Sequence, residues 1–105
     1  MRISKSFLER KLERFAKDAG LEISKGWQRQ PGDDRLTVKP GSIFLGKGDY
    51  GGWYVGSYSN ENGGEHQLTG WTRSLTAAEL VAWFEGAEWA MDHARRQITE
   101  AARES

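Results

Sequence analysis

The sequence contains no cysteine, only two prolines and no long hydrophobic run. Without cysteine the chain forms no disulfide, has no thiolate metal ligand and has no thiol nucleophile. A membrane-spanning helix needs about 20 consecutive apolar residues, and the sequence offers no such stretch. The charged stretch 1–15 lacks the apolar segment of a signal peptide. We therefore expect a cytoplasmic protein without a membrane partner.

The chain also lacks an excess of charge of either sign, because fifteen Lys and Arg residues balance fifteen Asp and Glu residues. Non-specific nucleic-acid binding draws most of its affinity from cationic contacts with phosphate, so this balance argues against that class. Five Trp, three Tyr and four Phe residues are too many for a disordered chain. A length of 105 residues provides for one domain with one core.

The first helical pattern lies near the N-terminus. Apolar residues recur at spacings of four and three from Leu8 to Ala19, which predicts a helix over 5–19. Ser6 opens a Ser-x-x-Glu capping box, and Gly20 follows where a left-handed residue commonly ends a helix.

A second, longer helix is predicted over 77–103. Thr76 and Glu79 form a capping box, and Leu75 and Leu80 have the spacing of a hydrophobic staple. An apolar stripe at helical spacing then comprises Leu80, Phe84, Ala87, Met91, Ala94, Ile98 and Ala101. Such a helix is roughly 40 Å long, whereas a compact chain of this size has a radius of gyration of about 13 Å. We expect its end to overhang, to fray or to pair with another chain.

Between the helices, the region 21–72 consists of short apolar or alternating stretches separated by turn signals rich in Gly, Pro, Asn and Asp. Short links favour antiparallel pairing. The predicted fold is therefore α+β, with both helices packed on one face of an antiparallel sheet of four or five strands. The predicted core residues are Leu8, Leu12, Phe15, Leu21, Ile23, Trp27, Leu36, Val38, Phe44, Trp53, Val55, Leu68, Leu80, Phe84, Met91 and Ile98.

No motif in the sequence specifies catalysis. Residues 46–51 have the form Gly-x-Gly-x-x-Gly, but a strand pattern follows at 53–58 where a phosphate-binding loop needs a helix. The segment therefore predicts a hairpin. His66 and His93 lie far apart in sequence and form no metal-binding pattern. We expect no enzyme, metal or cofactor; catalysis by loop carboxylates is the third alternative.

Two groups of aromatic residues are candidates for binding. Strand alternation places Tyr54 and Tyr58 on one face, with Gly56 leaving a slot between them. Trp71 is expected to join that face, and Arg73 to supply a cation. Such a face can stack nucleic-acid bases, each worth about 1–3 kcal/mol.

The second group lies on the C-terminal helix. Trp89 is off the apolar stripe, and Gly86 and Ala82 leave a notch beside it. A glycine inside a helix costs about 1 kcal/mol against alanine, which suggests close packing at that place. Exposed aromatic residues commonly mark protein interfaces.

The C-terminal half also resembles small tailed-phage and prophage proteins. The resemblance is carried by GWYVG at 52–56 in a hairpin, followed by LTAAEL at 75–80 and FEG at 84–86 at the start of a final helix. It implies an accessory protein that acts by binding a host or phage protein, with no catalytic residue.

We therefore interpret the sequence as a small non-enzymatic protein-binding module that binds a partner protein or itself. The alternative is a single-stranded nucleic-acid-binding protein that uses the aromatic sheet face. The predicted binding residues are Tyr50, Tyr54, Tyr58, Trp71, Arg73 and Trp89.

Overall fold

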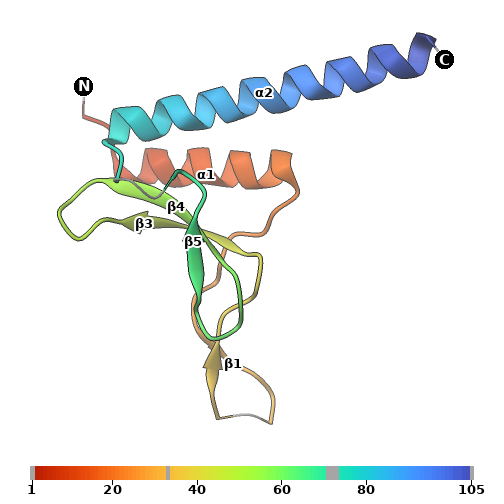
Figure 1. Cartoon of the computed structure of the whole chain (residues 1–105). Helices are drawn as coiled ribbons and strands as arrows, with labels where there is room; N and C mark the ends of the chain where they lie inside the picture. The colour runs from red at the N-terminus through yellow and green to blue at the C-terminus, as the bar shows by residue number, and fades with distance from the viewer. Residues whose placement is uncertain (1, 33, 71–73, 105) are drawn as a thin grey trace.

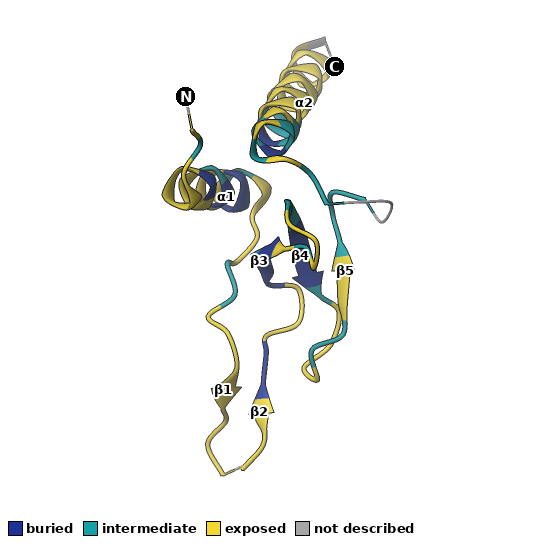
Figure 2. Ribbon diagram, turned by 90° about the vertical axis from the view of Figure 1, so that its left-hand side faces the viewer, coloured by how far each residue is buried: buried dark blue, intermediate teal, exposed yellow. Residues whose placement is uncertain are grey.

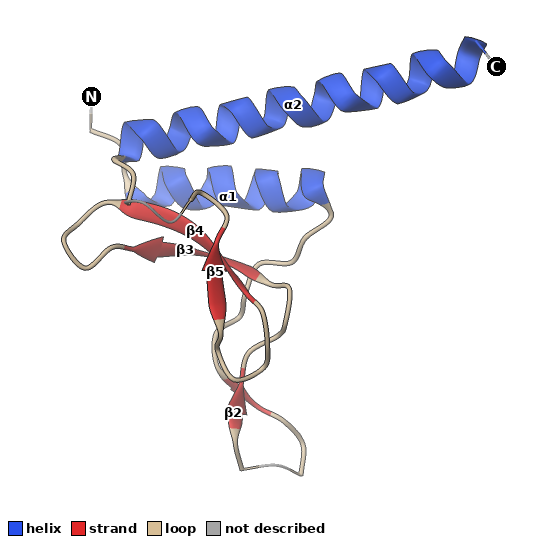
Figure 3. Ribbon diagram, viewed as in Figure 1, coloured by secondary structure: helices blue, strands red, loops and turns tan. Residues whose placement is uncertain are grey.

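The computed structural model describes residues 2–32, 34–70 and 74–104. Its elements are α1 (Lys5–Ala19), β1 (Gln28–Arg29), β2 (Leu36–Thr37), β3 (Ile43–Lys47), β4 (Trp53–Tyr58), β5 (Glu65–Gln67) and α2 (Ala77–Glu104). Figure 1 shows the two helices above a small sheet, with a narrow arm extending away from them. The same view coloured by secondary structure separates this helical layer from the strands (Figure 3). The α+β class and both helices are as predicted.

The strands form two antiparallel sheets, and the predicted single sheet of four or five strands is wrong. One sheet has the order β3-β4-β5, and the arm pairs β1 with β2. The arm strands have two residues each and pair with each other, with Gln28 opposite Thr37 and Arg29 opposite Leu36. The turn at Gly41, where φ is +83°, then separates the arm from β3. Upstream of the arm, Ile23 contributes only an isolated parallel bridge to Ile43.

Helix α1 has the predicted bounds but a different cap. The Ser4 hydroxyl accepts a hydrogen bond from the Phe7 backbone N–H at 3.2 Å, so Ser4 and not Ser6 is the N-cap. Because the helix begins at Lys5, Ser6 lies inside its first turn. Gly20 ends the helix as predicted, with φ of 71° in the left-handed region.

Helix α2 begins at the predicted capping box. The Thr76 N–H donates to the Glu79 carboxylate at 3.0 Å, and the Glu79 N–H donates to the Thr76 hydroxyl at 3.1 Å. Leu80 belongs to the buried core cluster, and Leu75 is partly buried and packs against it. Leu75 also exchanges two backbone hydrogen bonds with Trp53, at 2.7 and 2.8 Å, which ties the start of α2 to β4.

The two helices run in the same direction along one side of the three-stranded sheet (Figure 1). Ion pairs of 3.7 Å join Lys11 to Glu85 and Arg14 to Glu88. Helix α2 continues beyond the end of α1, as the sequence predicts for an overhanging end (Figure 1). The radius of gyration is 16.4 Å, larger than the roughly 13 Å of a compact domain of this length.

The core lies between the two helices and the β3–β4 hairpin (Figure 2). Its fully buried side chains include Ile43, which the sequence did not single out. The predicted core residues that are instead exposed are Leu21, Trp27, Leu36 and Ile98. They lie on the loop after α1, the arm and the overhanging end of α2, so no apolar layer reaches them.

Phe44 is a further correction, because it does not belong to the core cluster. Ile43 faces the helices, so alternation along β3 turns Phe44 to the opposite side. There it lies across Gly56, its register partner on β4, while Tyr54 lies across Gly46, its partner on β3. A Cβ atom added at either glycine would overlap the facing ring. Two glycine–aromatic pairs therefore complete the outer face of this hairpin.

We predict that Gly56→Ala lowers the free energy of unfolding by about 1–3 kcal/mol, because the Phe44 ring must move from a packed position. Urea denaturation measures the change. Gly86→Ala is the matched control: its Cβ would meet no described heavy atom within 4 Å, and it should raise stability by up to about 1 kcal/mol. A Gly56→Ala protein as stable as the wild type would contradict this packing.

Candidate functional site

Those predicted binding residues that the structure describes do not form one site. Tyr50 is fully exposed in the β3–β4 loop, Tyr54 and Tyr58 lie on β4, and Trp89 lies on α2. Trp71 and Arg73 fall outside the described residues. The structure thus brings together only the two tyrosines, on the sheet face that turns away from the helices.

The predicted slot between these tyrosines is filled. The Phe44 ring stacks on Tyr58 with centroids 4.6 Å apart and meets Tyr54 edge-on at 6.1 Å. It enters from the neighbouring strand because the register places Phe44 opposite Gly56. A base cannot enter this space without displacing the ring. The sequence could not reveal this, because strand register is not visible in the alternation of β4 alone.

Tyr54 is further fixed by a polar contact. Its hydroxyl donates a hydrogen bond to the Glu65 carboxylate on β5 at 3.2 Å. Burial raises the pKa of Tyr54, and the negative charge and hydrogen bond of Glu65 raise that pKa further. The hydrogen bond attaches this side chain to the neighbouring strand.

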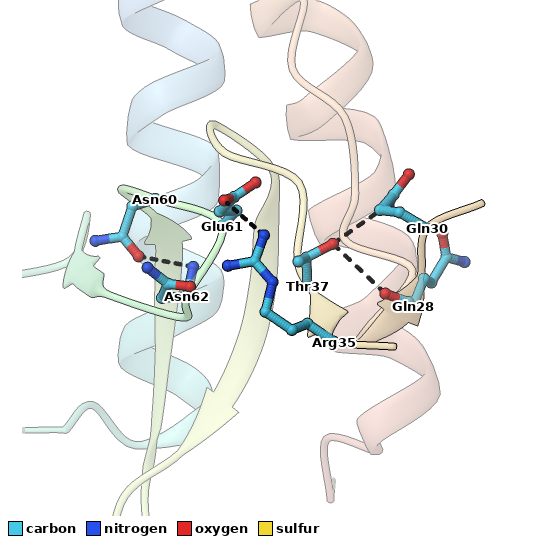
Figure 4. Close-up of polar contacts among 7 residues, drawn as sticks. All are labelled: Gln28, Gln30, Arg35, Thr37, Asn60, Glu61 and Asn62. Carbon is cyan, nitrogen blue, oxygen red and sulfur yellow. Dashed lines mark hydrogen bonds and ion pairs between the residues drawn. The ribbon is translucent and has the colours of Figure 1, made fainter. Parts of the chain in front are cut away.

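A polar groove of about 530 Å³ lies beside the arm, at a place that the sequence did not indicate. The Thr37 hydroxyl accepts from the Gln30 side-chain amide at 3.3 Å and donates to the Gln28 carbonyl at 3.5 Å (Figure 4). Arg35, in the arm just before β2, lies 3.9 Å from Glu61 on the loop between β4 and β5 (Figure 4). The contacts of Thr37 hold the two strands of the arm together, and the ion pair joins the arm to the loop between β4 and β5.

Two carboxylates, Glu22 and Glu61, line this groove. The hydrogen bond from Lys39 to Glu22, 2.6 Å long, and the charge of Lys39 lower the pKa of Glu22. An acid with a lowered pKa is a poor proton donor near neutral pH. Glu22 is therefore poorly suited to donate a proton.

The outer face of α2 carries an exposed aromatic residue beside exposed small ones. Trp89 is 69% exposed and stacks on His93, with centroids 5.0 Å apart and planes at 4°. Gly86 lies one turn earlier, and a Cβ there would meet no described heavy atom within 4 Å. The neighbouring residues Ala78, Ala82 and Ala90 are exposed as well. The notch predicted beside Trp89 is thus open to solvent.

The end of α2 is a second uncovered surface. The Arg95 guanidinium donates to the Asp18 carbonyl near the end of α1, at 2.5 Å. Every described side chain from Asp92 to Arg103 is exposed, over a length of about 18 Å. Ile98, on the predicted apolar stripe, is 70% exposed.

Helix α1 carries a basic surface with an aromatic ring. Phe7 is partly exposed, with the Arg10 guanidinium 6.0 Å and the Lys11 ammonium 5.8 Å from its ring centre. These residues and Arg14 line a shallow groove of about 240 Å³. The sequence did not single out this ring as a candidate.

Comparisons of the chain with protein-family models, curated proteins and solved structures find no match. Within residues 2–32, 34–70 and 74–104, no cluster of three or more His, Asp or Glu side chains is arranged to hold a metal ion. In the same residues, neither helix combines the length and apolar character needed to cross a membrane.

We predict that Glu65→Gln lowers the pKa of Tyr54, because the substitution removes a negative charge beside the hydroxyl. Phenolate absorbance during alkaline titration measures this pKa, and Tyr54→Phe identifies the contribution of Tyr54. An unchanged titration in Glu65→Gln would contradict the contact.

The raised pKa of Tyr54 also predicts that the stability of the fold depends on pH. Because folding raises the pKa of Tyr54, its stabilising contribution is complete below the unfolded value of about 10. That contribution is lost as pH rises through the folded value. Urea denaturation between pH 9 and 11 should therefore show a steeper loss of stability in the wild type than in Tyr54→Phe; equal slopes would count against the shift.

Proposed function

We propose that this chain is a small non-enzymatic protein-binding module that docks through α2. The observation that carries the proposal is the exposure of Trp89 on the outer face of a helix whose opposite face is anchored in the core. Ile98 lies on that opposite face and is exposed where the helix extends beyond the core. Large apolar side chains on a rigid helix lose little entropy on binding, and tryptophan is enriched among residues that dominate binding energy. The helix is therefore preorganised to present Trp89.

The sheet face is less suited to docking than α2. Phe44, Tyr54 and Tyr58 pack on one another, and Tyr54 is also bonded to Glu65. A partner could bury only the part of each ring that the other side chains leave exposed. We therefore assign docking to the helix, which the sequence left open as an alternative to the sheet.

The proposed setting is the cytoplasm of a bacterial host, as an accessory protein of a phage or prophage. The support is the resemblance of the C-terminal half to such proteins, which act by binding. A non-enzymatic role is supported at the polar groove by the ion pair of Glu22 and by the hydrogen bonds of the Thr37 hydroxyl.

To test docking, wild-type protein, Trp89→Ala and Tyr50→Ala are immobilised and incubated with a bacterial lysate, and the retained proteins are quantified by mass spectrometry. Trp89→Ala should lose a specific retained protein at least tenfold. Tyr50→Ala is the matched control, because Tyr50 is an exposed aromatic residue on a loop far from α2 in sequence. Identical retention by all three proteins would refute docking through Trp89.

A second candidate is single-stranded nucleic-acid binding, now favoured at α1 rather than at the sheet. The specific observation is Phe7 with Arg10 and Lys11 beside its ring, since single-strand binders combine cations with stacking aromatic residues. The positive charge of this surface on α1 is partly neutralised, because Glu85 lies 3.7 Å from Lys11.

Fluorescence anisotropy of a labelled oligonucleotide tests this alternative. Binding should weaken steeply as salt increases, and Arg10→Ala or Phe7→Ala should weaken it further. Tyr58→Ala is the control that detects use of the sheet face instead. Absence of an anisotropy change at low salt would exclude the nucleic-acid function.

A further inference from the structure

We propose that the outer edge of β3 binds an extended peptide segment of another protein, which adds to the sheet as a further strand beside Leu45 and Lys47. The peptide carries an apolar side chain that fills the groove between this edge and α1, and a basic side chain that meets Glu13. The site lies on a different element from the docking helix α2 and is independent of the proposed function.

The backbone of β3 faces two ways. β3 is the outer strand of the three-stranded sheet. The Tyr58 N–H donates to the carbonyl of Ser42, just before β3, at 3.0 Å, so the even-numbered residues exchange hydrogen bonds with β4. In antiparallel pairing the intervening residues direct their N–H and C=O groups away from that neighbour. The residues that do so here are Ile43, Leu45 and Lys47.

The chain itself occupies this edge only at Ile43. The Ile43 N–H donates to the Glu22 carbonyl at 2.9 Å, and the Ser24 N–H donates to the Ile43 carbonyl at 2.7 Å. A continuing parallel ladder would next join Leu45 to Ser24 and Gly26. Instead, the Gly26 N–H donates to the Ser24 hydroxyl at 3.1 Å, and the φ of Gly26, +81°, turns the chain away. In Figure 1 the chain that leaves α1 accordingly passes the start of β3 and not its end.

The rest of the edge is open. No hydrogen bond from the described residues reaches the outward N–H and C=O groups of Leu45 and Lys47. An extended peptide supplies the matching acceptors and donors, which is how strand addition binds. Lysine on an edge usually prevents such pairing. Here the Lys47 ammonium lies 5.3 Å from the centre of the Trp53 ring on β4, so this side chain is directed across the sheet rather than beyond its edge.

A groove of about 240 Å³ between this edge and α1 has room for a side chain of the added strand. Its apolar lining includes the buried Leu12 of α1 and the partly buried Ile23 and Leu45. Side chains that stand level on neighbouring strands point to the same face of a sheet. A peptide residue level with Leu45 therefore directs its side chain toward α1 and into the groove.

The charges on the groove favour a basic peptide. Lys5, Glu9 and Glu13 line its α1 side. The Lys5 ammonium lies 3.9 Å from the Glu9 carboxylate, so these two charges balance. None of the ion pairs within residues 2–32, 34–70 and 74–104 includes Glu13. This side of the groove thus has a net negative charge, which complements a Lys or Arg side chain of the peptide.

A second copy of the chain is a poorer occupant of this edge than a peptide. In an edge-to-edge pair, the partner's strand would be another β3, whose edge is already occupied at Ile43. The apolar side chain that β3 presents on the helix side is Leu45, which packs on its own core. Pairing of two copies would therefore leave both grooves unfilled, whereas a free peptide can fill the groove.

Selection of random nine-residue displayed peptides on the immobilised full chain tests the site. The enriched sequences should alternate apolar and polar residues and contain at least one Lys or Arg. Absence of enrichment over the bare support would overturn the inference. Enrichment only of sequences with helical spacing of apolar residues would also overturn it.

The most enriched peptide is then synthesised with a fluorescent label, and fluorescence anisotropy measures its affinity. Lys47→Pro removes one outward N–H but no hydrogen bond to β4, and edge strands tolerate proline at such a position. It should weaken binding at least tenfold. Lys47→Ala is the matched control: it loses the same side chain, keeps the N–H and should bind within twofold of the wild type. Equal affinities of the two variants would refute strand addition.

Glu13→Gln tests the charge of the groove, and it should weaken binding of the basic peptide about threefold or more. Trp89→Ala should bind the peptide as the wild type does, because α2 does not form this site. Loss of peptide binding in Trp89→Ala would place the peptide on α2 and overturn the inference, while leaving the proposed function intact.

Amide hydrogen exchange of the wild type locates the bound peptide without any substitution. Saturation with the peptide should slow exchange at Leu45 and Lys47 at least tenfold, because their N–H groups gain acceptors. Unchanged exchange at both amides would contradict the site. Slower exchange that depends on protein concentration without peptide would identify a second copy as the occupant and overturn the assignment to a peptide.

Discussion

Burial of the Phe84 ring is the interaction on which the rest of the structure depends. The ring is fully buried and lies 5.9 Å from Phe15 of α1 and 5.4 Å from Trp83. Val55 and Ile43 of the hairpin join the same cluster. One apolar cluster therefore holds both helices and the sheet, and it is small. Segments that extend beyond its reach, such as the arm and the end of α2, must be stabilised locally.

Local stabilisation takes a different form in each segment. The outer sheet face uses rings that lie over glycines of the neighbouring strand. The joint at the arm uses polar contacts of Thr37 and a backbone bond from the Val38 N–H to the Glu61 carbonyl, 3.0 Å long. The end of α2 has its own helical hydrogen bonds. This division explains why the molecule is extended although its central core is closely packed.

The sequence predicted the helices well because their signals are local. The Thr76–Glu79 box and Gly20 act within one turn, so their effect is readable from neighbouring residues. The sheet was harder to predict, since pairing joins residues distant along the chain. Trp27 illustrates the difficulty: its ring lies against Gly63, on a loop more than thirty positions later, and it is half exposed.

The candidate site was hard to predict for the same reason, because it depends on contacts between residues distant along the chain. Alternation along β4 correctly placed Tyr54 and Tyr58 on one face, but the ring between them comes from β3 and depends on register. The shared face of Trp89 and Gly86 could be predicted because both lie on one helix with fixed geometry. Which residues share a face of a single helix can thus be predicted from sequence more reliably than a surface shared by several strands.

The long sequence separation between the two helices has a consequence for synthesis of the chain. The apolar side of α1, with Leu8 and Phe15, is buried partly by α2, which follows about sixty residues later. At ribosomal rates of about 5–20 residues per second, α2 is made several seconds after α1. During that interval α1 presents an uncovered apolar surface, so the nascent chain has a period in which chaperone binding or premature association competes with folding.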